Sequence, residues 1–295
     1  MELRERLQSA LDIAYTIESE LGGGGMSRVF VATEIALGRR VVVKILPPER
    51  IGGVDVERFR REIQLAAQLV HPHIVPLLSA GELDGMPFYT MPFVEGESLR
   101  VLLEREKTLS PSESVRLAQE IADALDYAHR RGILHRDIKP ENVLLHDGHA
   151  LVTDFGIARA ITQASATATL TQAGVVLGTP AYMSPEQTIG ERELDGSTDV
   201  YSLGCMLYEM LTGAPPFTGR TPQAVFARHL TETAPSARSE RPDVPEHIEL
   251  AISTALAKES RLRHATASAF ARALSDGHSS TAAADMKPRL SPGVP

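Results

Sequence analysis

The chain has 295 residues and a formal net charge of −8, and 43% of its residues are hydrophobic and 23% charged. This composition suffices for two lobes around a cleft, and the acidic balance argues against a general nucleic-acid or anionic-membrane binder. No uncharged apolar run approaches the length that spans a bilayer, and the N-terminus does not resemble a signal peptide. The single cysteine, Cys205, has no partner for a disulfide. We therefore expect a cytoplasmic globular protein with no transmembrane segment in this chain.

The first 94 residues predict an antiparallel β-sheet with hairpins. Short β-branched runs alternate with turn residues such as Leu37-Gly38 and Asp84-Gly85. One segment, 54–69, instead has apolar residues at helical spacing with charges on the opposite face, which predicts a helix. The runs that we expect to form strands are 15–19, 28–32, 39–46, 74–83 and 87–91.

Beyond Glu97 the sequence predicts helices. Ser110 and Pro111 are typical of an N-cap followed by a first-turn proline, and Gly132 and Gly213 predict helix ends. The segments with a period of 3.6 residues are 98–106, 110–132 and 198–213.

These patterns divide the chain into three parts. We expect an α+β fold in which residues 1–94 form a small β-rich lobe and residues 95–274 a larger, mainly helical lobe. Residues 275–295 are small, polar and proline-containing, which is typical of a disordered tail.

A run of four glycines, at positions 22–25, lies between two predicted strands. Because glycine loses more freedom on folding than any other residue, such a run suggests a backbone that approaches a ligand closely, such as a phosphate chain. A hairpin tip or a linker is the alternative. Lys44 follows on an apolar strand, and Glu62 on the predicted helix could pair with it. Taken alone, each of these two side chains could simply reach solvent.

The sequence ILHRDIKPENVLL concentrates polar groups within an apolar frame. Asp137 could accept a proton from a hydroxyl, Lys139 could balance charge on a transferring group, and Asn142 offers an oxygen to a metal. A polar surface loop is the alternative, although the flanking apolar residues tie this loop to a core.

A third cluster, LVTDFGIAR, places Asp154 at the end of a predicted strand, before Phe155 and Gly156. A carboxylate there suits Mg²⁺ bound to nucleotide phosphates. One Asp-Phe-Gly tripeptide is a weak signal, because such tripeptides occur in ordinary turns. It gains weight only in sequence with the other two clusters.

Together, the motifs resemble the catalytic domain of protein kinases, and more narrowly that of bacterial eukaryotic-like (Hanks-type) Ser/Thr kinases. The resemblance covers roughly residues 15 to 274 and rests on the glycine loop, Lys44, Glu62, HRDIKPEN, DFG and GTPAYMSPE, in that order. It implies a two-lobed kinase fold that transfers the γ-phosphate of ATP to Ser or Thr hydroxyls of proteins. The glycines would then close over the ATP phosphates.

The resemblance also implies the residues around the nucleotide. Ser27 replaces the third glycine of the family's loop, a mild departure because the two glycines of closest approach remain. Met91 resembles the gatekeeper, the carbonyl of Pro92 would accept from the adenine amino group, and the N–H of Val94 would donate to the ring. Val42 stands where the family often has alanine. The remaining implied contacts are Leu21, Gly22, Gly24 and Gly25 in the phosphate loop, Val29 above the adenine and Leu144 below it.

In the family pattern, Asp137 is the catalytic base and Lys139 lies beside the γ-phosphate. Asn142 and Asp154 would hold Mg²⁺ or Mn²⁺, while Lys44 would contact the α- and β-phosphates and pair with Glu62. The lysine in KPEN favours Ser/Thr over Tyr specificity.

Thr179 of GTPAYMSPE also favours Ser/Thr specificity, because it resembles the threonine that bridges Asp137 and Lys139 in the family.

The resemblance further implies regulation by phosphorylation. Arg136 would receive a phosphate from the activation segment, which lies between Asp154 and Glu186, with Thr171 the first choice for autophosphorylation and Thr169 the second. A solvated loop with inert threonines is the alternative. Other implied contacts are a buried Glu186–Arg263 ion pair and an Asp199 that braces the HRD backbone.

Two other functions compete with this hypothesis. A nucleotide-binding pseudokinase or scaffold would share the fold, but Lys44, Glu62, Asp137, Asn142 and Asp154 are all present. A small-molecule phosphotransferase is disfavoured by the long activation segment, which resembles a peptide-docking element. The partners expected are protein substrates and, by analogy, a possible second copy of the chain, and no nucleic acid. The chain could also be the intracellular part of a longer membrane protein.

Overall fold

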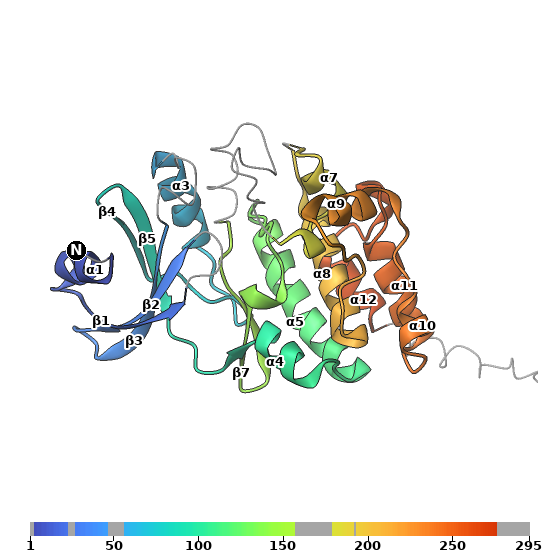
Figure 1. Ribbon diagram of the computed structural model, residues 1–295, viewed down its shortest axis with the longest axis horizontal. Coiled ribbons are helices and arrows are strands. Elements are labelled where there is room, and N and C mark those ends of the chain that lie inside the picture. Colours follow the sequence, from blue (N-terminus) through green and yellow to red (C-terminus); the bar gives the residue numbers. More distant parts are fainter. Residues whose placement is uncertain (1–2, 23–26, 47–55, 157–178, 192, 276–295) are drawn as a thin grey trace, which may run out of the picture.

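The computed structural model describes residues 3–22, 27–46, 56–156, 179–191 and 193–275. A β-rich part and a helical part lie side by side along the long axis of the molecule (Figure 1). The five-stranded sheet ends at Pro92 in β5, and the first helix of the helical part begins at Leu99. The expected α+β, two-lobed kinase fold class is confirmed. The predicted boundary after Val94 lies in the connection between these elements.

The β-rich part is an antiparallel sheet with the strand order β1-β2-β3-β5-β4. Hairpin turns at Gly38 and at Asp84-Gly85 have positive φ angles, which explains the turn residues seen in the sequence. The strands are β1 (Tyr15–Gly22), β2 (Arg28–Glu34), β3 (Arg39–Ile45), β4 (Ser79–Leu83) and β5 (Met86–Pro92). The predicted strand at 74–83 is shorter than expected, because only its second half pairs with β5.

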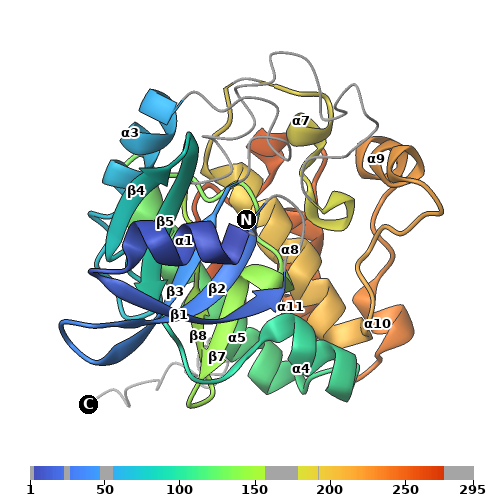
Figure 2. The ribbon, with the colours of Figure 1, turned by 60° about the vertical axis from the view of Figure 1, so that its left-hand side comes forward.

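In the described residues, two helices accompany the sheet. The predicted helix is confirmed as α3 (Val56–Ala66), and a further helix, α1 (Leu3–Leu11), was not expected. Figure 2 shows α1 lying across the strands. Leu7 of α1 is fully buried in a core that it shares with Tyr15, Ile17, Phe30 and the strand residues around them.

Strand β3 is the central strand, and its two faces serve different purposes. Val41, Val43 and Ile45 point into the core under α1, whereas Val42 belongs to a separate apolar cluster. Because side chains alternate along a strand, Lys44 lies on the same face as Val42. This alternation places a lysine at the edge of an apolar surface.

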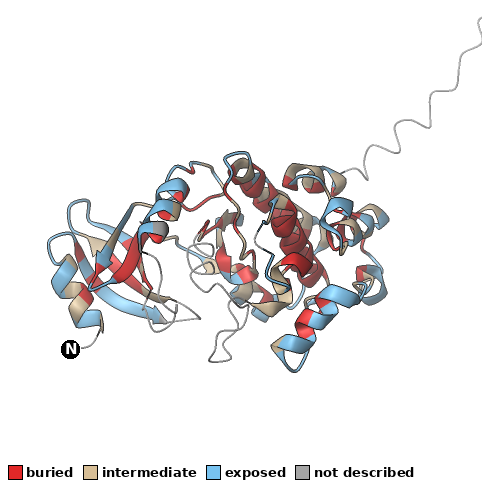
Figure 3. Ribbon diagram, turned by 90° about the horizontal axis from the view of Figure 1, so that it is seen from above, coloured by how far each residue is buried: buried red, intermediate tan, exposed pale blue. Residues whose placement is uncertain are grey.

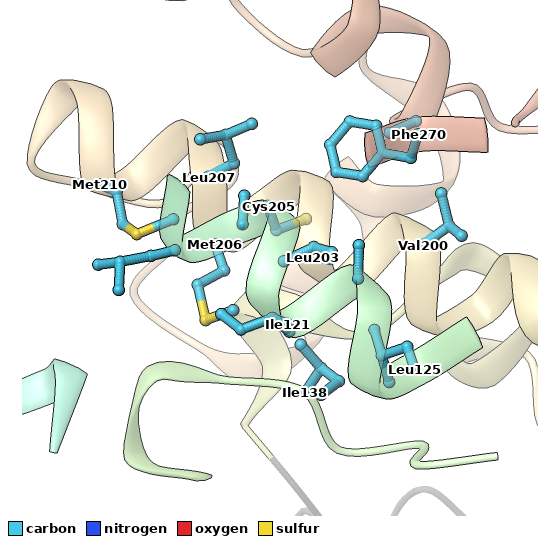
Figure 4. Packing of buried hydrophobic residues seen from close by; sticks show 14 of the residues in the cluster. Ile121, Leu125, Ile138, Val200, Leu203, Cys205, Met206, Leu207, Met210 and Phe270 are labelled. Atoms are coloured by element: carbon cyan, nitrogen blue, oxygen red, sulfur yellow. The ribbon is translucent and has the colours of Figure 1, made fainter. Parts of the chain in front are cut away.

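The helical part is built around α8 (Gly196–Thr212), in which fifteen of the seventeen residues are buried. It packs against α5 (Pro111–His129), α11 (Glu246–Ala255) and α12 (Ala267–Ala273). Figure 3 shows buried residues running through the middle of this part, and Figure 4 shows Cys205, Met206 and Leu203 of α8 against Ile121 and Leu125 of α5. The other helices within the described ranges are α4 (Leu99–Glu106), α7 (Pro185–Thr188), α9 (Pro222–Thr231), α10 (Ala237–Glu240), η1 (Pro140–Asn142), η2 (Pro180–Tyr182) and η3 (Ser260–Leu262).

The caps predicted at Ser110 and Gly213 are found, whereas α5 ends at His129, three residues before the predicted end at Gly132. The Ser110 side chain accepts a hydrogen bond from the N–H of Glu113 at the start of α5, and Gly213 ends α8 with φ 87°. Helix α8 begins two residues before the predicted start, because Asp195 caps it.

A small second sheet of β6 (Glu97–Ser98), β7 (Val143–His146) and β8 (His149–Val152) lies where the two parts meet. A turn at Asp147-Gly148, where both residues have positive φ angles, joins β7 and β8. This hairpin carries the segment with Asn142 on one side and Asp154 on the other, so it brings two predicted metal ligands together.

Candidate active site

The catalytic loop, residues 135–142, is held in place by one buried carboxylate of α8. Asp199, which is 0% exposed on α8, accepts hydrogen bonds from the backbone N–H of His135 (2.9 Å) and of Arg136 (2.7 Å). Its Oδ2 also lies 2.7 Å from His129 Nε2 at the end of α5. Burial alone would raise the pKa of Asp199, but these partners lower it. The expected role of Asp199 as a brace is confirmed.

His135 links this loop to the segment that contains Asp154. Its Nε2 lies 2.8 Å from the carbonyl oxygen of Thr153. Its ring packs edge-on against the ring of Phe155, with 4.8 Å between the ring centroids. The N–H of Thr153 donates to the carbonyl of Asn142 at 3.0 Å. The loop and the segment therefore form one hydrogen-bonded unit.

Two residues in this unit have left-handed backbones. Arg136 has φ 69° and Asp154 has φ 68°, and neither is glycine. Such a conformation costs free energy and persists only where the surroundings hold it. For Arg136, the hydrogen bond from its N–H to Asp199 is one contact that holds this conformation.

Asp137 gathers the polar side chains of the loop. Lys139 Nζ lies 2.7 Å from Asp137 Oδ2, and Asn142 Nδ2 donates to the same oxygen (3.1 Å) and to the Asp137 carbonyl (2.8 Å). The amide nitrogen of Asn142 thus faces Asp137, and the acceptor oxygen is the atom that a cation could use.

Asp154 is held by two side chains from the sheet. Lys44 Nζ lies 2.5 Å from its Oδ2, and the Tyr89 hydroxyl donates to its Oδ1 at 2.8 Å. Thr153 Oγ1 adds a longer bond of 3.3 Å to Oδ1. Burial opposes ionisation of Asp154, but Lys44 and Tyr89 together lower its pKa. Burial and the Asp154 charge raise the pKa of Tyr89, so this phenol keeps its proton and donates.

The donor set fits a divalent cation. Asp154 supplies carboxylate oxygens and Asn142 an amide oxygen, and hard cations such as Mg²⁺ prefer oxygen ligands. The two residues are connected by the backbone bond between Asn142 and Thr153. The ion pair of Lys44 among the described residues is with Asp154, and the predicted Lys44–Glu62 pair stays a prediction.

An apolar cluster lies beside this polar group. Val42, Val75 and Met91 are buried together, and Val29, Val94 and Leu144 pack against them partly buried. The structure therefore gathers five of the residues expected around the adenine: Val29, Val42, Met91, Val94 and Leu144. Thr153 connects this cluster to the candidate metal ligand Asp154, which follows it in the chain, because the Thr153 hydroxyl contacts Met91 Sδ at 3.3 Å. Pro92 follows Met91 at the end of β5.

Comparison with known proteins agrees with this geometry. The family model for the protein kinase domain matches residues 15–277. The chain belongs to the protein kinase family. It is 40% identical over 267 residues to serine/threonine-protein kinase PknB of Mycobacterium tuberculosis, covering 88% of this chain and 42% of that protein. It is also 40% identical over 255 residues to serine/threonine-protein kinase PrkC of Bacillus subtilis, covering 86% of this chain and 39% of that protein.

The resemblance to bacterial Ser/Thr kinases is thereby confirmed. The chain spans about two fifths of the length of these curated relatives. In the part of the kinase domain that the structure describes, no helix has the length and apolarity to traverse a bilayer.

Several predicted kinase residues are not placed by the structure. Gly24 and Gly25 of the phosphate loop lie outside the described residues, as do Thr169 and Thr171. Gly22 ends β1, and the neighbouring Leu21 is 57% exposed. Thr179 immediately precedes η2, and no hydrogen bond among the described residues joins it to Asp137 or Lys139. Its bridging role stays a prediction.

The base of the activation segment is anchored as expected. Glu186 on α7 forms a double hydrogen bond with Arg263, at 2.7 and 2.8 Å, and both side chains are buried. Gln187 next to it donates to the carbonyl of Arg136 at 2.7 Å. The activation segment is therefore tied to the catalytic loop beside Asp137.

Two contacts of the kinase site were missed in the sequence. Tyr89 and Asp154 are 65 residues apart, and His129 and Asp199 are 70 apart, so no local pattern joins them. The available signal for Tyr89 was its register: it lies directly opposite Lys44 in the β3–β5 ladder. Both side chains then lie on the same face and reach the same carboxylate.

Proposed function

We propose that this kinase domain transfers the γ-phosphoryl group of ATP to Ser or Thr hydroxyls of protein substrates, with Mg²⁺ as the metal. The observation that supports this most is the convergence of Asp137, Lys139 and Asn142 in one hydrogen-bonded group, linked through Thr153 to Asp154 and Lys44. Phosphoryl transfer requires mainly positioning and charge neutralisation, and this group offers both.

The proposed roles follow from the chemistry of each side chain. The Asp137 carboxylate accepts the proton of the attacking hydroxyl. Among the described residues, Lys139 and Asn142 contact its Oδ2, so Oδ1 is the oxygen that we assign to the hydroxyl. Lys139, whose Nζ lies 2.7 Å from Asp137 Oδ2, neutralises charge on the transferring phosphoryl group. Lys44 binds the α- and β-phosphates.

Asp154 and Asn142 hold the cation, which when bound neutralises phosphate charge and orients the terminal phosphate. The apolar cluster of Val42, Met91 and Leu144 encloses the adenine.

Regulation, assembly and location are further parts of the proposal. We propose that the kinase phosphorylates its own activation segment, at Thr171 before Thr169, and that Arg136 receives the phosphate. Pairing of two copies through the β-rich lobe, residues 1–94, and a cytoplasmic location complete the proposal. Mn²⁺ is an alternative metal with the same ligand preferences.

The direct test is incubation with ATP and Mg²⁺, followed by mass-spectrometric mapping of phosphate on the chain and on an added protein acceptor. Asp137→Asn is the matched control, because it keeps the size of the side chain and removes the base. We expect phosphate on Ser or Thr that disappears in the control. ATP binding without phosphate in either protein would favour a scaffold. Phosphate transferred only to a small-molecule alcohol would favour a metabolite kinase.

A further inference from the structure

Tyr89 holds the carboxylate of Asp154 from the sheet side. Its side chain is 2% exposed, and its hydroxyl lies 2.8 Å from Asp154 Oδ1. Because Tyr89 is opposite Lys44 in the β3–β5 register, the two side chains reach Asp154 from neighbouring strands. Lys44 takes Oδ2 and Tyr89 takes Oδ1, so each oxygen has its own partner.

We propose that Tyr89 is a positioning residue that fixes the orientation of the Asp154 carboxylate for the divalent cation. The inference rests on the proposed function, because it assigns the cation to Asp154. The terminal torsion of an aspartate is broad and roughly two-fold, so one partner leaves the carboxylate free to rotate. Partners on both oxygens remove that freedom.

The surroundings of Asp154 make such a hold necessary. Its backbone has φ 68°, outside regular secondary structure, and β8 has already ended at Val152. Lys44 is a flexible cation that is expected to move onto the nucleotide phosphates, which would release Oδ2. The Tyr89 ring is fixed by burial in the sheet and keeps its hold on Oδ1.

The hydroxyl of Tyr89 is compatible with a cation on the same carboxylate. Tyr89 and Thr153 donate to Oδ1, so Oδ2 is the oxygen that would hold the cation once Lys44 has moved onto the phosphates. Removal of a group that hydrogen-bonds a metal ligand typically weakens metal affinity about 10- to 100-fold. We expect a value near the lower end of this range, about 10-fold, because Thr153 also donates to Oδ1.

The experiment measures metal binding without phosphoryl transfer. Mn²⁺ is titrated into the chain saturated with a non-hydrolysable ATP analogue, and free Mn²⁺ is followed by electron paramagnetic resonance. Tyr89→Phe should raise the Kd for Mn²⁺ about 10-fold, and the half-saturating Mg²⁺ concentration for phosphorylation should rise in parallel. The kcat at saturating Mg²⁺ should change far less.

Tyr201→Phe is the matched control. It also removes a buried tyrosine hydroxyl, which lies 2.8 Å from His229 Nδ1, but on α8 away from Asp154. Its Kd for Mn²⁺ should equal that of the parent chain, even if its melting temperature falls as much as that of Tyr89→Phe.

A double-mutant cycle with Asp154→Asn isolates the contact from general effects on folding. If Tyr89 acts through Asp154, then Tyr89→Phe should add no further loss of Mn²⁺ affinity in the Asp154→Asn background. An additive loss, or an unchanged or lower Kd in Tyr89→Phe alone, overturns the inference. A lower Kd would mean that the hydroxyl competes with the cation. Mn²⁺ binding without phosphoryl transfer would refute the proposed function alone, whereas no metal-dependent nucleotide binding would refute both.

Discussion

The catalytic loop and the apolar cluster around Val42 face the same site but are held in different ways. The loop is oriented by buried charges and hydrogen bonds from α8, with Asp199 at their centre. The cluster is held by packing of Val42, Val75 and Met91. The difference matches the task of each region. Hydrogen bonds and charges fix the orientation of the catalytic groups, whereas packed apolar side chains define the shape of the pocket.

This contrast has an energetic consequence. Removal of one member of a buried charged network leaves its partners buried without compensation, so the loss extends to folding. Removal of an apolar side chain at the edge of a pocket costs mainly contact area. Changes in the first region should therefore affect stability and rate together, and changes in the second should affect nucleotide affinity alone.

The largest effect is expected from Asp199→Ala. The substitution leaves the N–H groups of His135 and Arg136 and the ring of His129 without their shared acceptor. We expect the free energy of unfolding to fall by about 3–5 kcal/mol. Urea denaturation of the purified chain measures this. Asp199→Asn keeps one acceptor oxygen and should lose less; equal losses in both variants would show that hydrogen-bond acceptance is not what matters.

The Glu186–Arg263 pair should make stability depend on pH. Burial would raise the pKa of Glu186, but Arg263 and Thr198 lower it below the ordinary value of 4.5. Its stabilisation is therefore complete above about pH 4.5 and is lost as the pH falls through the lowered pKa of the folded state. Glu186→Gln should cost about 2 kcal/mol at pH 7. The urea midpoint of Glu186→Gln should approach that of the parent chain as the pH is lowered from 7 to 3. A difference in midpoint that stays constant over this range would contradict the assignment.

Leu144→Ala tests the apolar side of the comparison. The side chain is half-buried at the edge of the cluster, so its loss should change folding little. We expect KM for ATP to rise roughly 5- to 10-fold, corresponding to about 1–1.5 kcal/mol of lost contact, with kcat nearly unchanged. Steady-state kinetics at varied ATP measures both. A fall in kcat as large as the rise in KM would mean that packing also orients the reacting groups.

The smallest effect is expected from Ser110→Ala, at the end of α5 opposite to His129. Loss of this N-cap should reduce the free energy of unfolding by about 1 kcal/mol. Neither KM for ATP nor kcat should change, because the His129–Asp199 contact is at the other end of the helix. If kcat fell together with stability in Ser110→Ala, the catalytic loop would depend on the whole of α5 and not only on its His129 end. That result would weaken the contrast between the two regions.

The sequence predicted the elements whose signals are local. Strands β1, β2, β3 and β5, helix α5 and the turns at Gly38 and Asp84-Gly85 follow from alternation, capping and turn residues. The motifs of the site were found because kinase chemistry requires particular residues in a fixed order.

The remainder depends on contacts between distant segments. The hydroxyl of Tyr89 meets Asp154 only after β5 pairs with β3, and nothing near position 89 indicates a polar partner. The ladder with β5 likewise begins only at Ser79, although 74–78 is richer in β-branched and apolar residues than 79–83. Helix α1 is short, and its burial comes from β1, so tertiary packing decides it.

Helix α1 also bears on where a minimal kinase fragment should be cut. The family match starts at residue 15, after this helix, yet Leu7 is fully buried in the core of the sheet. Gln8 bonds the backbone of Tyr15 and Ile17, and Arg4 donates to the carbonyl of Glu18. An expression fragment designed on family boundaries would uncover an apolar face and three backbone groups of β1, at Tyr15, Ile17 and Glu18. For this chain, the boundary of the folding unit therefore lies upstream of the boundary of the family.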